Sequence, residues 1–334
     1  MIQSGRSVRL ASLILLTTSL LFAGCASQKP LPEHPEGVDY YVQGVQLNKS
    51  GKIDQAIDMW EKAVIANPKL RMAHVMLGDA YRSRGDYSRA AVHYDAATKL
   101  DRYSFSNHYN LGVAYQMLNR LEEAATAYLS AIELNPRDVK SNMNLGLVYL
   151  ALGKNDSAVT FLDRATKLDP SYGPARSNLG VALDARGDLM AAESNYRKAL
   201  ELDSKNLVTQ QNLAQNLISQ KKTSEALTIM EHVLTQTDSP AAHKRYGDAL
   251  AQARKFDQAT AQMDIALKAD PTYIPAINGK ADVLILQYTA GLELDDKLRM
   301  TALDLWRSSL KMNPNQPGIA ESIKKWTQPG LFGN

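Results

Sequence analysis

The sequence predicts an all-α solenoid of eight helix–turn–helix repeats over residues 37–316. The first observation is a period, because a small residue, in most cases preceded by leucine, recurs every 34 residues with one interval of 33. The second is that apolar residues within each unit follow the i, i+3, i+4, i+7 spacing of an amphipathic helix. The third is that composition does not change between residues 37 and 316. The recurring small residues are Gly44, Gly78, Gly112, Gly146, Gly180, Ala214, Gly247 and Ala281.

Each repeat carries the same residue types at the same places. A small residue and a later alanine, such as Gly112 and Ala124, are expected where the two helices of a pair cross most closely. Gly85, Gly153 and Gly187 fall between the paired helices, where a helix C-terminus often needs a left-handed residue. One pair cannot cover its own apolar face, so pairs are expected to stack around a concave inner wall.

These positions resemble the tetratricopeptide-repeat pattern of L-G-x-x-Y, A-x-x-x-aromatic and a closing proline. The matching residues are Tyr81, Tyr115 and Tyr149; Ala56, Ala90, Ala124, Ala158, Ala192, Ala226 and Ala259; Trp60, Tyr94, Tyr128 and Tyr196; and Pro68, Pro136, Pro170 and Pro271. The resemblance covers some 280 residues and implies a right-handed superhelix whose first helices line the concave wall.

The eighth repeat departs from the period. Its second-helix alanine is Ala302, although without an insertion it would fall at residue 293. Nine residues are therefore added near 288–299, where they are expected to lengthen the turn or the helices. Residues 317–334 are expected to form a capping helix and tail, with Trp326 packed on the last repeat and the two lysines Lys324 and Lys325 exposed.

The N-terminus reads as an export signal. Arg6 and Arg9 precede a short apolar run, Leu10–Phe22, and two small residues. Cys25, the only cysteine, follows at once. The four residues from Phe22 to Cys25 resemble the lipobox of bacterial lipoproteins. The resemblance implies that residues 1–24 are cleaved, that Cys25 is lipidated, and, through Ala26, that the anchor is in the outer membrane. Residues 25–36 then form a flexible tether. The alternative is an ordinary signal peptide that ends near a cysteine.

Charge argues against nucleic acid as a partner. Cleavage after residue 24 removes two arginines and no acid, so the formal charge falls from +3 to +1. Lysine and arginine are interspersed with aspartate and glutamate along the chain, and no basic stripe follows a helix.

The candidate binding residues lie just before the recurring Leu-Gly or Leu-Ala. Four consecutive repeats place asparagine there: Asn110, Asn144, Asn178 and Asn212. The row resembles the asparagine ladder in the peptide-binding arm of O-linked N-acetylglucosamine transferase, which implies that these amides hold a peptide backbone. Tyr109, Met117, Met143 and Leu147 would form an apolar wall beside them. Alternatively, the asparagines satisfy neighbouring backbone groups and only keep the groove wet.

Two other kinds of site are not predicted. A carboxylate clamp is doubtful because Arg245 matches its pattern but Ala241 stands where lysine is expected. His74, His108 and His243 are whole repeats apart, so they are expected to pack rather than to bind metal. No nucleotide loop, serine elbow or metalloprotease motif is found. We therefore expect neither a cofactor nor enzymatic activity.

These observations favour a non-enzymatic scaffold, lipid-anchored in the bacterial outer membrane and facing the periplasm. Its expected partners are proteins or peptides of the cell envelope, in pilus, secretion, polysaccharide-export or cell-wall machinery. The alternative is a structural spacer that uses its convex face or its ends. The oligomeric state is not predicted.

Overall fold

The structure is a computed structural model that describes residues 36–291 and 295–327. Within these ranges it contains seventeen α-helices and no strand, so the prediction of an all-α solenoid is confirmed. The predicted signal segment, Cys25 and the tether lie outside the described residues, apart from Glu36.

Sixteen of the helices form eight helix–turn–helix pairs, each with a first and a second helix. The first helices are α1 (Val38–Lys49), α3 (Arg71–Ser83), α5 (Phe105–Met117), α7 (Val139–Ala151), α9 (Gly173–Arg186), α11 (Leu207–Ser219), α13 (Pro240–Gln252) and α15 (Ile274–Ala290). The second helices are α2 (Ile53–Ala66), α4 (Tyr87–Leu100), α6 (Leu121–Leu134), α8 (Asn155–Leu168), α10 (Leu189–Leu202), α12 (Thr223–Gln236), α14 (Phe256–Ala269) and α16 (Asp296–Met312). The last helix, α17 (Pro317–Thr327), follows the eighth pair.

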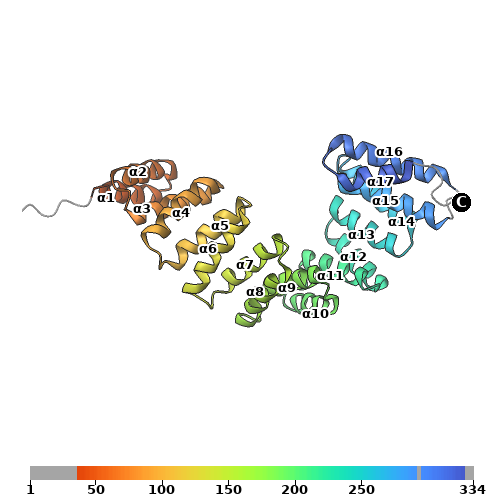
Figure 1. Ribbon diagram of the computed structural model, residues 1–334, viewed down its shortest axis with the longest axis horizontal. Helices are drawn as coiled ribbons and strands as arrows, with labels where there is room; N and C mark the ends of the chain where they lie inside the picture. Colours follow the sequence, from red (N-terminus) through yellow and green to blue (C-terminus); the bar gives the residue numbers. More distant parts are fainter. Residues whose placement is uncertain (1–35, 292–294, 328–334) are drawn as a thin grey trace, which may run out of the picture.

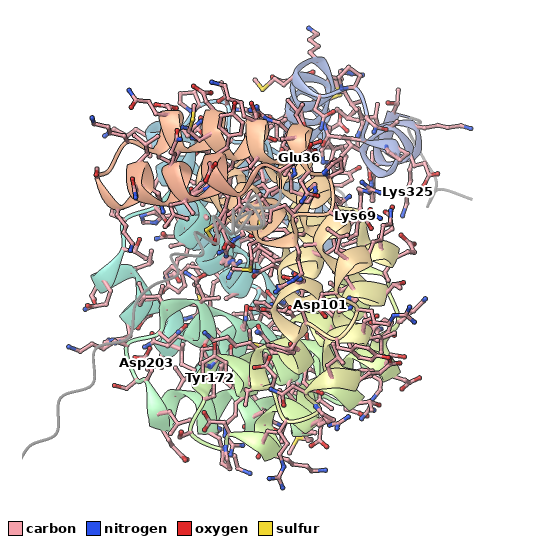
Figure 2. The ribbon with its side chains drawn as sticks, turned by 90° about the vertical axis from the view of Figure 1, so that its left-hand side faces the viewer. Glu36, Lys69, Asp101, Tyr172, Asp203 and Lys325 are labelled. Carbon is pink, nitrogen blue, oxygen red and sulfur yellow. The ribbon has the colours of Figure 1, made fainter. Side chains whose placement is uncertain are left out.

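The pairs stack in chain order into a long curved array (Figure 1). Viewed from its left-hand end, the array winds around a common axis, and the turns that hold Lys69, Asp101, Tyr172 and Asp203 follow one another around it (Figure 2). Several first helices contact the first helix of the next repeat directly, as α7 does α9 and α13 does α15, whereas successive second helices contact each other less. Because elements on the inside of a curve lie closer together, the first helices line the inner surface.

Within a pair, the small residue of the first helix lies under a large side chain of the second. A Cβ placed on Gly112 would lie 2.7 Å from Cδ1 of Tyr128, and one on Gly78 would lie 2.6 Å from Cε1 of Tyr94. The glycine is therefore small to admit an aromatic ring, which adds to the close helix crossing that the sequence predicts. Ala214 and Ala281 replace glycine in repeats whose second helices offer Met230 and Trp306 instead of tyrosine.

The turn inside each pair needs a left-handed residue in most repeats. Gly85, Gly153 and Gly187 have φ angles of 74°, 69° and 91°, as their positions in the sequence predict. The same conformation is adopted without glycine at Asn119, Lys221 and Arg254, with φ of 56°, 63° and 59°. The turn geometry is thus set by the repeat and not by glycine alone.

The added residues of the last repeat extend its helices. Both α15 and α16 have 17 residues, whereas α13 has 13 and α14 has 14. Helix α17 then covers the end of the array, where Trp326 meets Tyr288 edge-on at 6.2 Å between ring centroids. Arg299 Nη1 donates to the carbonyl oxygen of Trp326 at 2.6 Å. Trp326 therefore packs on the last repeat, as the sequence predicts, and Lys324 and Lys325 are exposed.

Candidate functional site

The four predicted asparagines occupy the same position on four successive first helices. Asn110 lies on α5, Asn144 on α7, Asn178 on α9 and Asn212 on α11, and all four are half-buried. Within the described residues, the side chains of Asn110, Asn178 and Asn212 make no hydrogen bond, and none of their polar atoms is a buried atom without a partner. These three amides are therefore open to water, or to a ligand, at the inner surface.

Asn144 differs because its amide is already engaged. Its Nδ2 donates to the hydroxyl oxygens of Tyr109, at 3.4 Å, and Tyr128, at 3.3 Å. The hydroxyl of Tyr128 in turn donates to Oε1 of Gln116 at 2.8 Å. Burial raises the pKa of both phenols, so each remains neutral at physiological pH. This network ties α5, α6 and α7 together beneath the row of asparagines.

The hydroxyl of a second-helix tyrosine reaches the inner surface in other repeats too. Tyr94 donates to Oδ1 of Asp79 at 2.6 Å, and Tyr196 donates to Oδ2 of Asp184 at 2.8 Å. Asn216 also donates to Asp184, whose pKa burial raises. The reason is geometric: each ring crosses the first helix over a glycine, and its hydroxyl emerges beside polar residues on the far side.

The repeat pattern identifies these tyrosines only as the aromatic residues of the second helices and does not reveal this role. The sequence nevertheless carries a signal for it. In the repeats of Tyr94, Tyr128 and Tyr196, the tyrosine follows the first-helix glycine by sixteen residues, and a polar residue stands one or four positions after that glycine. A polar partner is needed because a buried phenol without one is costly.

The predicted apolar wall is only partly exposed. Met117 is 57% exposed at the end of α5, whereas Tyr109, Met143 and Leu147 are half-buried. Tyr109 also stacks against Phe105, with 6.0 Å between ring centroids. Met117 is therefore the member most available to a partner.

The clamp residues and the histidines are held by their neighbours. Arg245 Nη1 donates to Oε1 of Gln211 at 2.6 Å, and Ala241 is exposed without offering a charge. His74 Nδ1 lies 3.1 Å from His93 Nδ1, and His108 Nε2 lies 3.0 Å from the carbonyl oxygen of Arg102. His243 lies between Asp238 and Gln262, at 2.7 and 2.6 Å. Each predicted histidine thus has a packing role.

The described residues also lack two kinds of feature. Across residues 36–291 and 295–327, no three histidine, cysteine, aspartate or glutamate side chains are grouped so that they could hold a metal ion. In the same ranges, no helix has both the length and the apolar character needed to cross a membrane.

The fold and this inner surface define a tetratricopeptide-repeat solenoid. Residues 40–249 match the family described as the Cilia and flagella-associated protein 70 C-terminal domain. Because the match covers more than half of the chain, the chain belongs to this tetratricopeptide-repeat family. Comparison with curated proteins gives no match.

Solved structures agree on the fold. A tetratricopeptide repeat protein from Parabacteroides merdae is 17% identical with a TM-score of 0.66, and the alignment covers 77% of this chain and 99% of that one. The APC/C hetero-tetramer Cut9–Hcn1 is 14% identical with a TM-score of 0.58, and the alignment covers 87% of this chain and 58% of that one. Proteins of this fold are generally non-enzymatic scaffolds for protein–protein interaction, and their curved arrays present extended concave binding surfaces.

Proposed function

We propose that the protein is a lipid-anchored scaffold of the bacterial envelope that binds extended segments of partner proteins along the inner surface of its first helices. The observation that carries the proposal is the row of water-accessible amides at Asn110, Asn178 and Asn212. A carboxamide offers both a donor and an acceptor, so it can pair with a peptide unit whatever the peptide's side chains are.

The spacing of the row suits an extended chain. Packed helices lie about 8–10 Å apart, and an extended peptide rises about 3.3 Å per residue. Successive asparagines would therefore meet the ligand backbone about every third residue, which leaves the side chains between them free to select the partner. Asn144, held by Tyr109 and Tyr128, would keep the middle of the row rigid.

The test is site-specific photo-crosslinking in intact cells. One probe replaces Asn178, whose side chain makes no hydrogen bond within the described residues, so that no internal hydrogen bond is lost. The matched probe replaces Lys198, which is exposed on the second helix α10 of the same repeat. The proposal expects one envelope protein to be captured from position 178 and not from position 198.

The opposite result would favour the alternative function. Capture from position 198 alone would indicate a spacer that works through its convex face, with the asparagines serving only to hydrate the groove. Capture from neither position would exclude peptide binding along this part of the inner surface.

The anchor is proposed from the sequence around Cys25, which lies outside the described residues. Acylation of a cysteine gives stable membrane attachment when more than one chain is added, at about 0.8 kcal/mol per buried CH₂. Labelling with alkynyl palmitate and fractionation of inner and outer membranes test this. Cys25→Ser is expected to abolish the label and release the protein from the outer membrane. Unchanged retention would contradict the anchor.

A further inference from the structure

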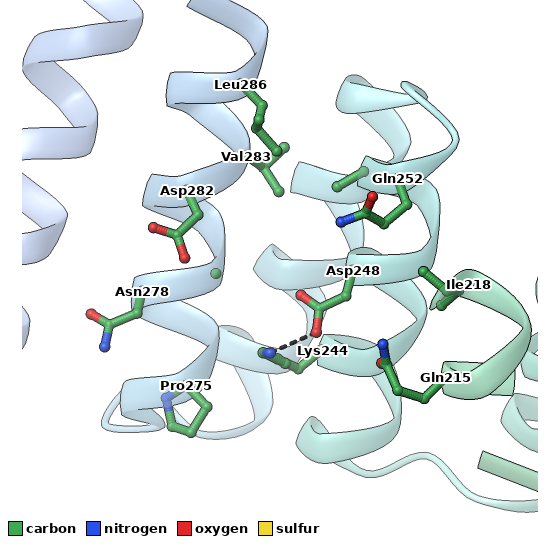
Figure 3. Close-up of a pocket in the computed structure, with 12 residues that line it drawn as sticks. Gln215, Ile218, Lys244, Asp248, Gln252, Pro275, Asn278, Asp282, Val283 and Leu286 are labelled. Atoms are coloured by element: carbon green, nitrogen blue, oxygen red, sulfur yellow. Dashed lines mark hydrogen bonds and ion pairs between the residues drawn. The ribbon is translucent and has the colours of Figure 1, made fainter. Parts of the chain in front are cut away.

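A pocket of about 400 Å³ opens on the inner surface where the row of asparagines ends (Figure 3). It lies between α11, α13 and α15, and its lining is mixed. Polar groups come from Gln215, Lys244, Asp248 and Asp282, and an apolar side from residues that include Leu286.

The asparagine row is broken at this pocket. The position held by asparagine in four earlier repeats is Arg245 on α13 and Gly279 on α15. Gly279 lines the pocket, and a Cβ there would lie 3.0 Å from Cε of Met263 and 3.5 Å from Cε of Lys244. Gly279 therefore packs closely against the buried Met263, and no side chain projects into the pocket from this position.

The charged groups of the pocket do not balance. Lys244 Nζ donates to Oδ2 of Asp248 at 2.6 Å, so these two residues neutralise each other. Asp282 occupies the position on α15 that corresponds to Asp248 on α13, and no cation lies within ion-pair distance of it among the described residues. The lining therefore carries one uncompensated negative charge.

The surroundings of Asp282 favour a cationic ligand. Burial raises its pKa, the indole N–H of Trp306 and the charge of Lys244 oppose this rise, and Asp248 adds to it, so the ionised carboxylate is only partly compensated. Asn278 also lines the pocket, but its amide points away from Lys244 and Asp248 (Figure 3), with Nδ2 donating to Gln316 Oε1 at 2.8 Å and Oδ1 buried, so the amide oxygen on offer is that of Gln215. Carboxylate and amide oxygens accept hydrogen bonds, and a guanidinium offers five N–H donors in one plane.

We propose that this pocket receives an arginine side chain of the extended peptide, with its guanidinium at Asp282 and its methylenes against Leu286. The inference rests on the proposed function, because it names the peptide side chain that the C-terminal end of the same inner surface would select. Most of the lining lies beyond residue 249, where the match to the family ends.

The test is a selection of random dodecapeptides displayed on phage, made against the full chain in detergent. Three forms are compared: the natural chain, Asp282→Asn, and Asp304→Asn as a control. Asp304 lies on the second helix α16 of the same repeat and is exposed, so the control makes the same charge change outside the pocket. Thermal melting verifies that all three forms fold.

The natural chain and Asp304→Asn are expected to enrich peptides that carry arginine at one aligned position, and Asp282→Asn to enrich peptides without that preference. One enriched peptide is then compared with its citrulline version, which keeps the shape and removes the charge. The natural chain should lose about tenfold or more in affinity, and Asp282→Asn less than about twofold.

Different failures have different meanings. The pocket assignment is wrong if the enriched peptides lack a basic residue or carry an acidic one at that position. It is also wrong if Asp282→Asn retains the arginine preference. In each of these cases the proposed function stands. If the natural chain enriches no peptide at all, both are overturned.

Discussion

Replacing Gly112 by alanine tests how the two helices of a repeat fit together. The added Cβ would lie 2.7, 2.8 and 3.0 Å from three atoms of the Tyr128 ring, whereas ordinary carbon contacts are about 3.5–4.0 Å. Tyr128 is fully buried, so its ring cannot move away without disturbing its neighbours. Its hydroxyl is also held by Gln116 and Asn144, so that a shift of the ring strains or breaks two hydrogen bonds.

These effects can be weighed against one another. Overpacking costs about 1–3 kcal/mol, and each weakened hydrogen bond adds about 1 kcal/mol. Alanine in place of glycine inside a helix returns about 1 kcal/mol. The expected result is a loss of about 2–4 kcal/mol in the free energy of unfolding, measured from the midpoint and slope of urea denaturation.

Two comparisons isolate the cause. Gly247→Ala makes the same change in the seventh repeat, but the nearest atom is Cε of Met263, at the end of a flexible side chain, so its expected effect is within about 1 kcal/mol of zero. Adding Tyr128→Met to Gly112→Ala recreates the pair that Ala214 and Met230 form in the sixth repeat, and part of the loss should be recovered. A Gly112→Ala protein as stable as the natural one, or strict additivity in the double variant, would refute this account.

Three further predictions concern other contacts. Burial, together with the charge of His74, lowers the pKa of His93 to about 4, so the unfolded chain binds a proton more readily and stability falls as pH drops from about 6.5 to about 4. The full pKa shift corresponds to a stability change of no more than about 3 kcal/mol, and the change is smaller because water reaches part of the ring. His93→Gln should make the melting temperature depend less on pH over this range, and an unchanged slope would contradict the assignment. Burial alone would raise the pKa of Glu193, but hydrogen bonds from Lys222, Arg197 and Gln220 lower it to about 2, so its contribution is present above about pH 4.5 and is lost toward pH 2. Glu193→Gln should cost about 2 kcal/mol in urea denaturation at pH 7, because Lys222 loses its carboxylate partner and Arg197 keeps only Glu225. A neutral effect would show that the cluster does not stabilise the packing of α10 against the turn between α11 and α12. Ala158→Leu should lower the melting temperature clearly, because Ala158 is fully buried where α8 meets α7, and an unchanged melting curve would contradict that close packing.

The sequence by itself determined the architecture of this protein. A solenoid repeats one local problem, because every pair must bury the same apolar faces against its neighbours, and the answer recurs as Gly112 and Ala124 do, at the same place in each unit. The left-handed turns at Gly85, Gly153 and Gly187 were predictable because glycine marks them, whereas the same turns at Lys221 and Arg254 carry no such mark. The row of asparagines could also be found, because its members differ in sequence number by a whole repeat.

Only the tertiary structure decided how the inner surface is used. The period does not reveal that Asn144 is engaged by two tyrosines while the side chain of Asn178 makes no hydrogen bond to any described residue, because this depends on where side chains of different helices meet. The pocket beside Gly279 was not predicted either, since it arises where the repeat pattern is broken and groups from three helices converge. Charge balance is divided in the same way: the pairing of Lys244 with Asp248 follows a local i,i+4 spacing, whereas the proximity of Asp282 to the same lysine depends on how α15 stacks on α13.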